Sequence, residues 1–208
     1  MQVLWLVRHG ESTWNVRGLA QGHCDQARLT DRGRRQARGV VDQLKTQPIR
    51  ALYSSDLHRA LETAVPLASA TGLTVTPDAR LRERCLGVLE GSATAAISPA
   101  VSGIRANRVV DPDARPDGGE SLRDFYQRVA CFTGDLAGRC PSDPGAGAGQ
   151  AGDVAVVAHG GTLRMLDACL RGIGVDQMAW PPLANGRILR SPPPGPAHLR
   201  NPYERKTP

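Results

Sequence analysis

Histidine and arginine side chains stand together at three places in this sequence where an apolar segment gives way to polar residues. The three places are Arg8 to Glu11, Ser54 to Arg59 and His159 to Gly161. A single histidine after a strand is usually structural, because its ring bonds a backbone carbonyl. Here an arginine directly precedes His9, and a glycine directly follows both His9 and His159, which is typical of a site where guanidinium groups and backbone amides bind an anion. The sequence therefore predicts a site for an anionic group such as phosphate.

Five apolar segments predict the strands that position these residues. They are Gln2 to Val7, Ile49 to Tyr53, Leu73 to Thr76, Asp153 to Ala158 and Ile188 to Leu189. The first and fourth are nearly continuous apolar runs, the pattern of strands buried on both faces, whereas the last is expected at the edge of a sheet.

Segments with apolar residues at helical spacing alternate with these strands. They are Leu57 to Thr71, Ser121 to Leu136, Thr162 to Leu170 and a segment that Thr30 and Asp31 open and that includes Leu44. Pro66 is expected to kink or split its helix, and Gly72 to end it. The alternation predicts an α/β fold with a doubly wound, mostly parallel sheet flanked by helices, where ligands bind beyond the carboxyl ends of the strands. Both histidine-bearing loops leave from such ends.

Composition narrows the class of protein and of partner. The chain has 208 residues, 40% of them hydrophobic, which fits one domain over residues 1–208. Its apolar runs are far shorter than the roughly 20 residues that span a bilayer, and no basic leader opens it, so we expect a cytoplasmic protein without membrane contact. The net charge is +6, but like charges do not cluster and aromatic residues are few, which favours a small anionic substrate over nucleic acid. Five scattered cysteines, none in a Cys-x-x-Cys pair, fit neither a zinc site nor a disulfide set.

Six short blocks along the chain carry a family resemblance. Leu6 to Asn15 reads Leu-Val-Arg-His-Gly-Glu-Ser-Thr-Trp-Asn, and further blocks follow at Leu29 to Gly33, Ser54 to Ala60, Leu81 to Gly87, Gly118 to Ser121 and Val157 to Gly161. In this order they closely resemble the motifs of the histidine phosphatase superfamily, in the branch with cofactor-dependent phosphoglycerate mutases and small-metabolite phosphatases. The resemblance covers most of the chain and implies a phosphoglycerate mutase-like fold.

The same resemblance implies a role in phosphoryl transfer for eight residues. His9 would be the nucleophile, since a neutral imidazole nitrogen needs no deprotonation near pH 7. Glu83 would protonate the leaving alcohol and then activate water, while Glu11 is expected to orient the first loop and Glu90 to be structural. The phosphoryl oxygens would be held by Arg8, Asn15, Gln21, Arg59, His159 and the Gly160 amide. With His159 protonated, three cations would replace the metal of other phosphatases, so neither a metal nor a cofactor is expected.

Three alternatives to a phosphatase of a small phosphorylated metabolite stay open. Cofactor-dependent phosphoglycerate mutases usually have an aromatic residue before the glycine that follows the catalytic glutamate, and a lysine-containing insertion soon after it. This chain has Leu86 before Gly87 and no lysine between Lys45 and Lys206, which favours the phosphatase. A non-catalytic phosphate-binding relative would have lost His9, Arg59 or Glu83, and all three are present. Nucleic-acid binding is supported by the net charge alone.

Substrate specificity is expected to depend on the segment near 92–118, the predicted cap over the site. Arg105, Arg108 and Arg115 are available there for a second anionic group. The stretch from Trp180 to Gly186 resembles that of phosphatases acting on sugar phosphates and phosphoglycerate esters.

Two segments are expected to lack helices and strands. Pro141 to Gly152 is dense in glycine, proline and alanine and predicts a flexible surface connection, and the region near 192–208 predicts a loose C-terminal tail. A homodimer is an arrangement that the sequence allows.

Overall fold

A five-stranded sheet forms the centre of the computed structural model, which describes residues 3–136 and 152–191. Its strands are β1 (Leu4–Arg8), β2 (Ile49–Ser54), β3 (Val75–Pro77), β6 (Asp153–Ala158) and β7 (Ile188–Ser191), in the spatial order β3-β2-β6-β1-β7. All neighbouring pairs are parallel except β1 and β7, which are antiparallel. The five predicted strands are confirmed, and β7 is the predicted edge strand.

The central strands are buried on both faces, which explains their continuous apolar sequence. In β1, Leu6 packs with one hydrophobic cluster and Val7 with the other. Val156 and Val157 of β6 divide in the same way, and all four side chains are fully buried. Because successive residues of a strand point to opposite faces, one apolar run fills two cores.

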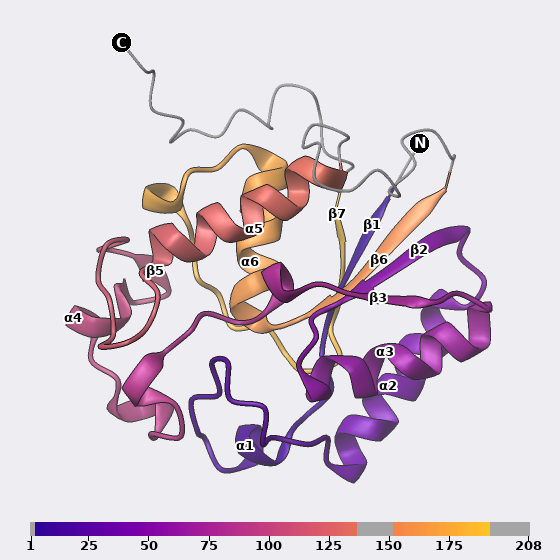
Figure 1. The fold of residues 1–208 in the computed structure, drawn as a ribbon, viewed down its shortest axis with the longest axis horizontal. Helices are drawn as coiled ribbons and strands as arrows, with labels where there is room; N and C mark the ends of the chain where they lie inside the picture. Colours follow the sequence, from indigo (N-terminus) through magenta and orange to yellow (C-terminus); the bar gives the residue numbers. More distant parts are fainter. Residues whose placement is uncertain (1–2, 137–151, 192–208) are drawn as a thin grey trace.

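Helices cover both faces of the sheet (Figure 1). The helices α2 (Asp31–Leu44) and α3 (His58–Thr71) pack on one face, and α5 (Leu122–Leu136) and α6 (Gly160–Arg171) pack on the other. Thr30 caps α2 by accepting a hydrogen bond from the Gly33 amide, and Gly72 ends α3 in the left-handed conformation. The predicted sheet flanked by helices is confirmed, and α6 begins two residues earlier than expected.

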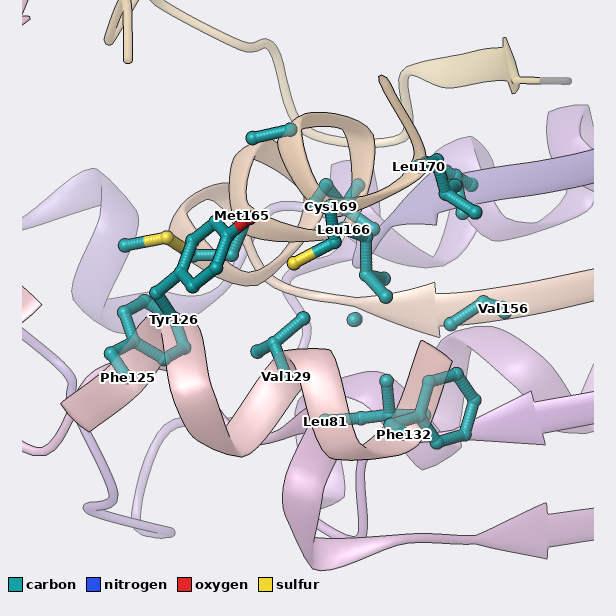
Figure 2. Packing of buried hydrophobic residues seen from close by; sticks show 14 of the residues in the cluster. Leu81, Phe125, Tyr126, Val129, Phe132, Val156, Met165, Leu166, Cys169 and Leu170 are labelled. Carbon is teal, nitrogen blue, oxygen red and sulfur yellow. The ribbon is translucent and has the colours of Figure 1, made fainter. Parts of the chain in front are cut away.

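The layer that α5 and α6 form contains the larger apolar side chains. Figure 2 shows Phe125, Tyr126, Val129 and Phe132 of α5 near Met165, Leu166 and Cys169 of α6 and Val156 of the sheet. The Tyr126 hydroxyl donates a hydrogen bond to the Ile173 carbonyl at 3.0 Å, beyond the end of α6. This packing holds α6 against the sheet and so fixes the position of its first turn.

Pro66 was predicted to kink or split its helix, and α3 runs through Pro66 as one helix, so the split does not occur. Thr63 and Ala64 before the proline and Leu67 after it are fully buried. Burial on both sides of the proline keeps the two halves in one helix and outweighs the roughly 3 kcal/mol cost of the missing amide.

The segment near 92–118 has little regular structure. It contains α4 (Pro99–Ser102) and an antiparallel pair of two-residue strands, β4 (Ile104–Arg105) and β5 (Arg108–Val109). Arg84 anchors this segment, because its guanidinium group donates to the carbonyls of Ser102 at 2.6 Å and Ala114 at 2.7 Å. The other short helices of the described ranges are α1 (Thr13–Val16) and the 3₁₀ turns Ala79–Leu81, Gly87–Leu89, Thr94–Ala96 and Val175–Gln177.

Within residues 3–136 and 152–191, no helix combines the length and the apolar character needed to cross a membrane. The predicted connection from Pro141 to Gly152 lies, except for its last residue, outside the described residues, as does the predicted tail near 192–208.

Candidate active site

The site begins at the carboxyl ends of three neighbouring parallel strands. His9 follows β1, His159 follows β6 and Ser55 follows β2, with β6 between the other two. Backbone hydrogen bonds continue the sheet by one residue, since His9 donates to the Ala158 carbonyl and Ser55 to the Val157 carbonyl, each at 2.9 Å. The imidazole rings of His9 and His159 consequently lie with their centroids 5.1 Å apart.

All eight residues predicted from the sequence line one cavity of about 410 Å³ at this edge of the sheet. They are Arg8, His9, Asn15, Gln21, Arg59, Glu83, His159 and Gly160. The far wall comes from the segment near 92–118 and from Trp180. A cavity of this size suits a small metabolite.

His9 is buried and presents one unprotonated ring nitrogen to the cavity. Its Nδ1 lies 2.7 Å from the carbonyl oxygen of Gly10, and a carbonyl can only accept, so Nδ1 carries the proton. Burial, followed by the charges of Arg59 and Arg8, holds the pKa of His9 well below its ordinary value of 6.5. At neutral pH His9 is therefore a neutral imidazole with a free lone pair on Nε2.

Gly10 allows close packing and does not bind an anion. A Cβ on Gly10 would lie 2.4 Å from the Gly33 carbonyl oxygen, so only glycine lets α2 approach the loop after β1. The Gly10 amide donates to Thr63 Oγ1 at 3.0 Å and is not free. The Gly10 amide is therefore not among the free donors of the site.

His159 has one bonded and one unpaired ring nitrogen. Its Nε2 lies 2.8 Å from Ser55 Oγ, while its buried Nδ1 has no hydrogen-bond partner among the described residues. Burial, and next the charge of Arg59, lowers the pKa of His159 well below 6.5. Before a ligand binds, His159 is therefore neutral, and its protonation beside a bound phosphoryl group stays a prediction. A buried unpaired nitrogen is costly, and a bound anion would relieve that cost.

Half-buried Arg8 and fully buried Arg59 are cations whose Nε groups have no partner among the described residues. Arg59 donates to the Cys24 carbonyl at 2.9 Å and the Gly22 carbonyl at 2.8 Å, and Arg8 donates to the Leu183 carbonyl. Burial lowers the pKa of both, that of Arg59 to about 10, so both stay charged at neutral pH.

Glu83 is held at the N-terminus of α6. Its Oε2 accepts a hydrogen bond from the Gly161 amide at 2.8 Å, and its Oε1 accepts one from the Arg84 amide at 2.9 Å. Gly160, the first residue of the helix, lines the cavity, and the first amides of a helix have no partner inside it. The carboxylate and the amide of Gly160 therefore share one helix end.

The other two carboxylates near the motifs are bonded elsewhere, and neither lines the cavity. Glu11 Oε1 accepts from Thr30 Oγ1 at 2.8 Å, and Glu90 Oε1 accepts from the amide of His23 at 2.7 Å. Among the described residues, no group of three His, Cys, Asp or Glu side chains could hold a metal ion.

The side-chain amides of Asn15 and Gln21 are held through their oxygens. Asn15 Oδ1 accepts from the Ser12 amide at 3.0 Å and from Asn185 Nδ2 at 3.1 Å, while Gln21 Oε1 accepts from Ser12 Oγ at 3.0 Å. The Nδ2 of Asn15 and the Nε2 of Gln21 are thereby available as neutral donors on the cavity wall.

The arginines proposed for a second anionic group lie elsewhere. Arg105, Arg108 and Arg115 are exposed and do not line the cavity, and Arg115 pairs with Asp124. Arg164 does line it, and the sequence interpretation missed this residue. The sequence spacing could have indicated Arg164, because a residue four positions after Gly160 lies on the same face of a helix.

Two supporting residues were also missed. Ser55 orients His159. The sequence pattern that could have indicated it is the pair of serines, Ser54 and Ser55, that closes a predicted strand. Asn185 donates from Nδ2 to the His9 carbonyl at 3.1 Å as well as to Asn15. Asn185 acts by joining loops that are distant in the sequence, so no local sequence pattern predicts its role.

Comparisons with known proteins agree on one relationship. A model of the histidine phosphatase superfamily (branch 1) matches residues 4–191. The chain is 39% identical over 181 residues to a glucosyl-3-phosphoglycerate phosphatase of Mycolicibacterium vanbaalenii, covering 86% of this chain and 78% of that protein. It is 42% identical over 167 residues to phosphoglycerate mutase-like protein 4 of Arabidopsis thaliana, covering 77% of this chain and 67% of that protein. A solved structure of a mycobacterial glucosyl-3-phosphoglycerate phosphatase with VO3 superposes with a TM-score of 0.75 at 33% identity, over 91% of this chain and 92% of that one.

Proposed function

Because the chain belongs to the histidine phosphatase superfamily, we propose that it hydrolyses phosphate monoesters of small metabolites through a phosphohistidine on His9, without a metal ion. The predicted family, the phosphoglycerate mutase-like fold and the histidine phosphatase class of enzyme are confirmed by the family match, the relatives and the mycobacterial structure. The roles of individual residues and the intermediate are the proposal.

The state of His9 is the observation that carries this proposal. The Nδ1 proton is committed to the Gly10 carbonyl, so the Nε2 lone pair is free to attack phosphorus. In the first step a bond forms between Nε2 and phosphorus, the bond from phosphorus to the ester oxygen breaks, and that oxygen takes a proton from Glu83. In the second step Glu83 accepts a proton from water, the water oxygen attacks phosphorus, and the bond to Nε2 breaks to release phosphate.

The transferring group is held by donors that the protein already positions. Arg8, Arg59, His159 and Gly160 line the cavity together with His9. The Nε atoms of both arginines and the Nδ1 of His159 are buried and have no hydrogen-bond partner among the described residues. Such preorganised donors stabilise the charge on the phosphoryl oxygens without reorganising during the reaction. The arginine charges and the helix end are the reason we propose that no metal is required.

The substrate class is a sugar phosphate or a phosphoglycerate ester. Relatives named for glucosyl-3-phosphoglycerate support this class, and a cavity of about 410 Å³ accommodates such a molecule. The sequence from Trp180 to Gly186 supports it as well, since Trp180 lies on the cavity wall.

Trapping the intermediate tests the proposal. The enzyme is mixed with a 3-phosphoglycerate ester labelled in the phosphate and denatured in alkali during turnover. We expect label on the protein that alkali spares and acid removes, no label on His9→Ala, and inorganic phosphate as the product. His58→Ala is the matched control, because His58 is exposed and pairs with Asp25 outside the cavity. An acid-stable label, or label retained by His9→Ala, contradicts the proposal, and an isomerised ester in place of phosphate indicates a mutase.

A further inference from the structure

Arg164 is a third guanidinium group at the site, next to the one that Arg8 supplies. Its Nη1 lies 3.1 Å from the point that a Cβ on Gly160 would occupy, and Arg8 Nε lies 3.5 Å from the same point. Both arginines therefore stand at the N-terminus of α6. Burial lowers the pKa of Arg164 to about 10, so it carries its charge at neutral pH.

Two contacts fix the guanidinium group of Arg164: hydrogen bonds along one edge and an aromatic ring against one face. Its Nε donates to the Pro181 carbonyl at 2.8 Å, and its Nη2 donates to the same oxygen. Its Cζ lies 5.1 Å from the ring centroid of Trp180, within cation–π range. The Trp180 amide donates to the Asn107 carbonyl at 2.6 Å, so the ring is itself anchored to the segment near 92–118. Nη1 forms no hydrogen bond within the described residues and is left for a ligand.

The cavity has more positive charge than a phosphoryl group requires. The charges of Arg8 and Arg59 match the two negative charges of a phosphate monoester. Arg84 also lines the cavity, but all three of its guanidinium nitrogens donate to backbone carbonyls. Arg164 is the cation that remains, and it has no carboxylate within ion-pair distance in the described ranges. Glu83 is the one acidic side chain on the described cavity wall.

We propose that Arg164 binds a carboxylate of the substrate, so that the preferred substrates are phosphate monoesters of hydroxy acids. This inference rests on the proposed phosphatase function and specifies its substrate. A guanidinium group with a free end forms a charge-assisted hydrogen bond to a carboxylate. A second phosphate group would need more donors than Nη1 offers. Trp180 is a positioning residue, because it restricts the rotation of the guanidinium group that makes the contact.

Two esters that differ only in the carboxylate test this assignment. The ratio of kcat/KM for 3-phosphoglycerate to kcat/KM for glycerol 3-phosphate is expected to be at least about 10 in the wild type. In Arg164→Gln the ratio should fall about 10- to 100-fold, the loss that corresponds to one charged hydrogen bond. Arg171→Gln is the matched control, since Arg171 is on the same helix, is exposed and pairs with Asp167. That control should keep the ratio.

Two further measurements separate binding of the carboxylate from a general effect on the fold. Competitive inhibition by glycerate, which has the carboxylate and no phosphate, should weaken in Arg164→Gln by a factor similar to the fall in the ratio. Trp180→Leu should raise KM for 3-phosphoglycerate more than it lowers kcat.

The opposite outcomes are equally specific. Equal losses on both esters in Arg164→Gln would assign Arg164 to the phosphoryl group or to stability and overturn the inference. A larger loss on a sugar bisphosphate than on 3-phosphoglycerate would overturn the carboxylate as the ligand. Failure of the underlying phosphatase proposal would give a different result. In that case the wild type would release no phosphate from either ester, or His9→Ala would release it as fast as the wild type.

Discussion

Glu83 rests directly on Gly161: its Oε2 accepts the Gly161 amide proton at 2.8 Å, and a Cβ on that glycine would lie 2.1 Å from Oε1. The same helix begins after His159, which is its N-cap residue. The proposed proton donor and a proposed phosphoryl ligand are therefore placed by one helix end. The second glycine after the histidine is required by the carboxylate and not by a backbone turn.

Gly161→Ala should disturb proton donation without touching the nucleophile. The added methyl group displaces the Glu83 carboxylate, so phosphorylation of His9 by an alkyl phosphate should slow at least 10-fold, measured by rapid quench. Gly39→Ala is the control, since nothing lies within 4 Å of a Cβ at Gly39 in α2. That control should keep the rate and raise the free energy of unfolding by about 0.5–1 kcal/mol. An unchanged alkyl phosphate rate in Gly161→Ala would show that the acid does not depend on this contact.

Glu83→Gln should separate leaving groups by their basicity. Alkyl oxygens leave poorly without a proton, whereas a nitrophenolate leaves without help. General acid assistance is typically worth ~10²–10⁴-fold, so phosphorylation of His9 by an alkyl phosphate should fall by about that factor and phosphorylation by nitrophenyl phosphate much less. Arg59→Ala should slow both. The first half-reaction must be followed, because Glu83 also activates water in the second. Equal slowing of both esters by Glu83→Gln would remove it as the leaving-group acid.

The free energy of unfolding should decrease as the pH is lowered, because His9 and His159 are buried as neutral rings. Below pH 6.5 the unfolded chain protonates both histidines, while the folded chain, in which both pKa values are lowered, does not. The free energy of unfolding is thus fully developed above pH 6.5 and should decrease by about 1 kcal/mol per histidine at pH 5.5. Urea unfolding at pH 7.5 and 5.5 measures this difference. His9→Gln and His159→Gln should each remove part of it, and an identical pH dependence in all three proteins would contradict the assignment.

Turnover should survive thorough removal of divalent metal ions. The charge on the phosphoryl group is met by Arg8, Arg59 and the helix end at Gly160, so dialysis against a chelator should change kcat less than about twofold. The measurement is phosphate release before and after chelation. Loss of activity that magnesium or zinc restores would mean that a metal ion performs the stabilisation assigned to these residues.

The sequence was sufficient for the strands, because they follow from local apolar patterns. The eight residues at the cavity were implied by the resemblance of six short blocks to a known family. The apolar runs that end at Arg8 and at Ala158 are buried on both faces, and parallel neighbours bring the next residues to one edge. The single domain, the cytoplasmic location and a homodimer stay predictions.

What the sequence did not disclose depends on contacts between distant segments. Pro66 was expected to kink or split its helix, and packing on either side of it keeps α3 a single helix. Exposed arginines near 92–118 were preferred to Arg164 because that segment was expected to cover the site. The anchoring of Arg164 by Trp180 and Pro181 joins two segments whose approach no local pattern predicts.

Arg84 connects the wall of the substrate cavity with the position of Glu83. It adjoins Glu83 in the chain, and its side chain is bonded to the carbonyls of Ser102 and Ala114 across the cavity wall. An insertion or deletion that shifts either carbonyl should also shift Arg84, the residue next to Glu83, the proposed proton donor. New substrate preferences gained by remodelling this wall therefore carry a cost in reaction rate, whereas His9, which is anchored to the sheet, is insulated from such changes. Divergence in this lineage should retain the arginine wherever the wall is exchanged.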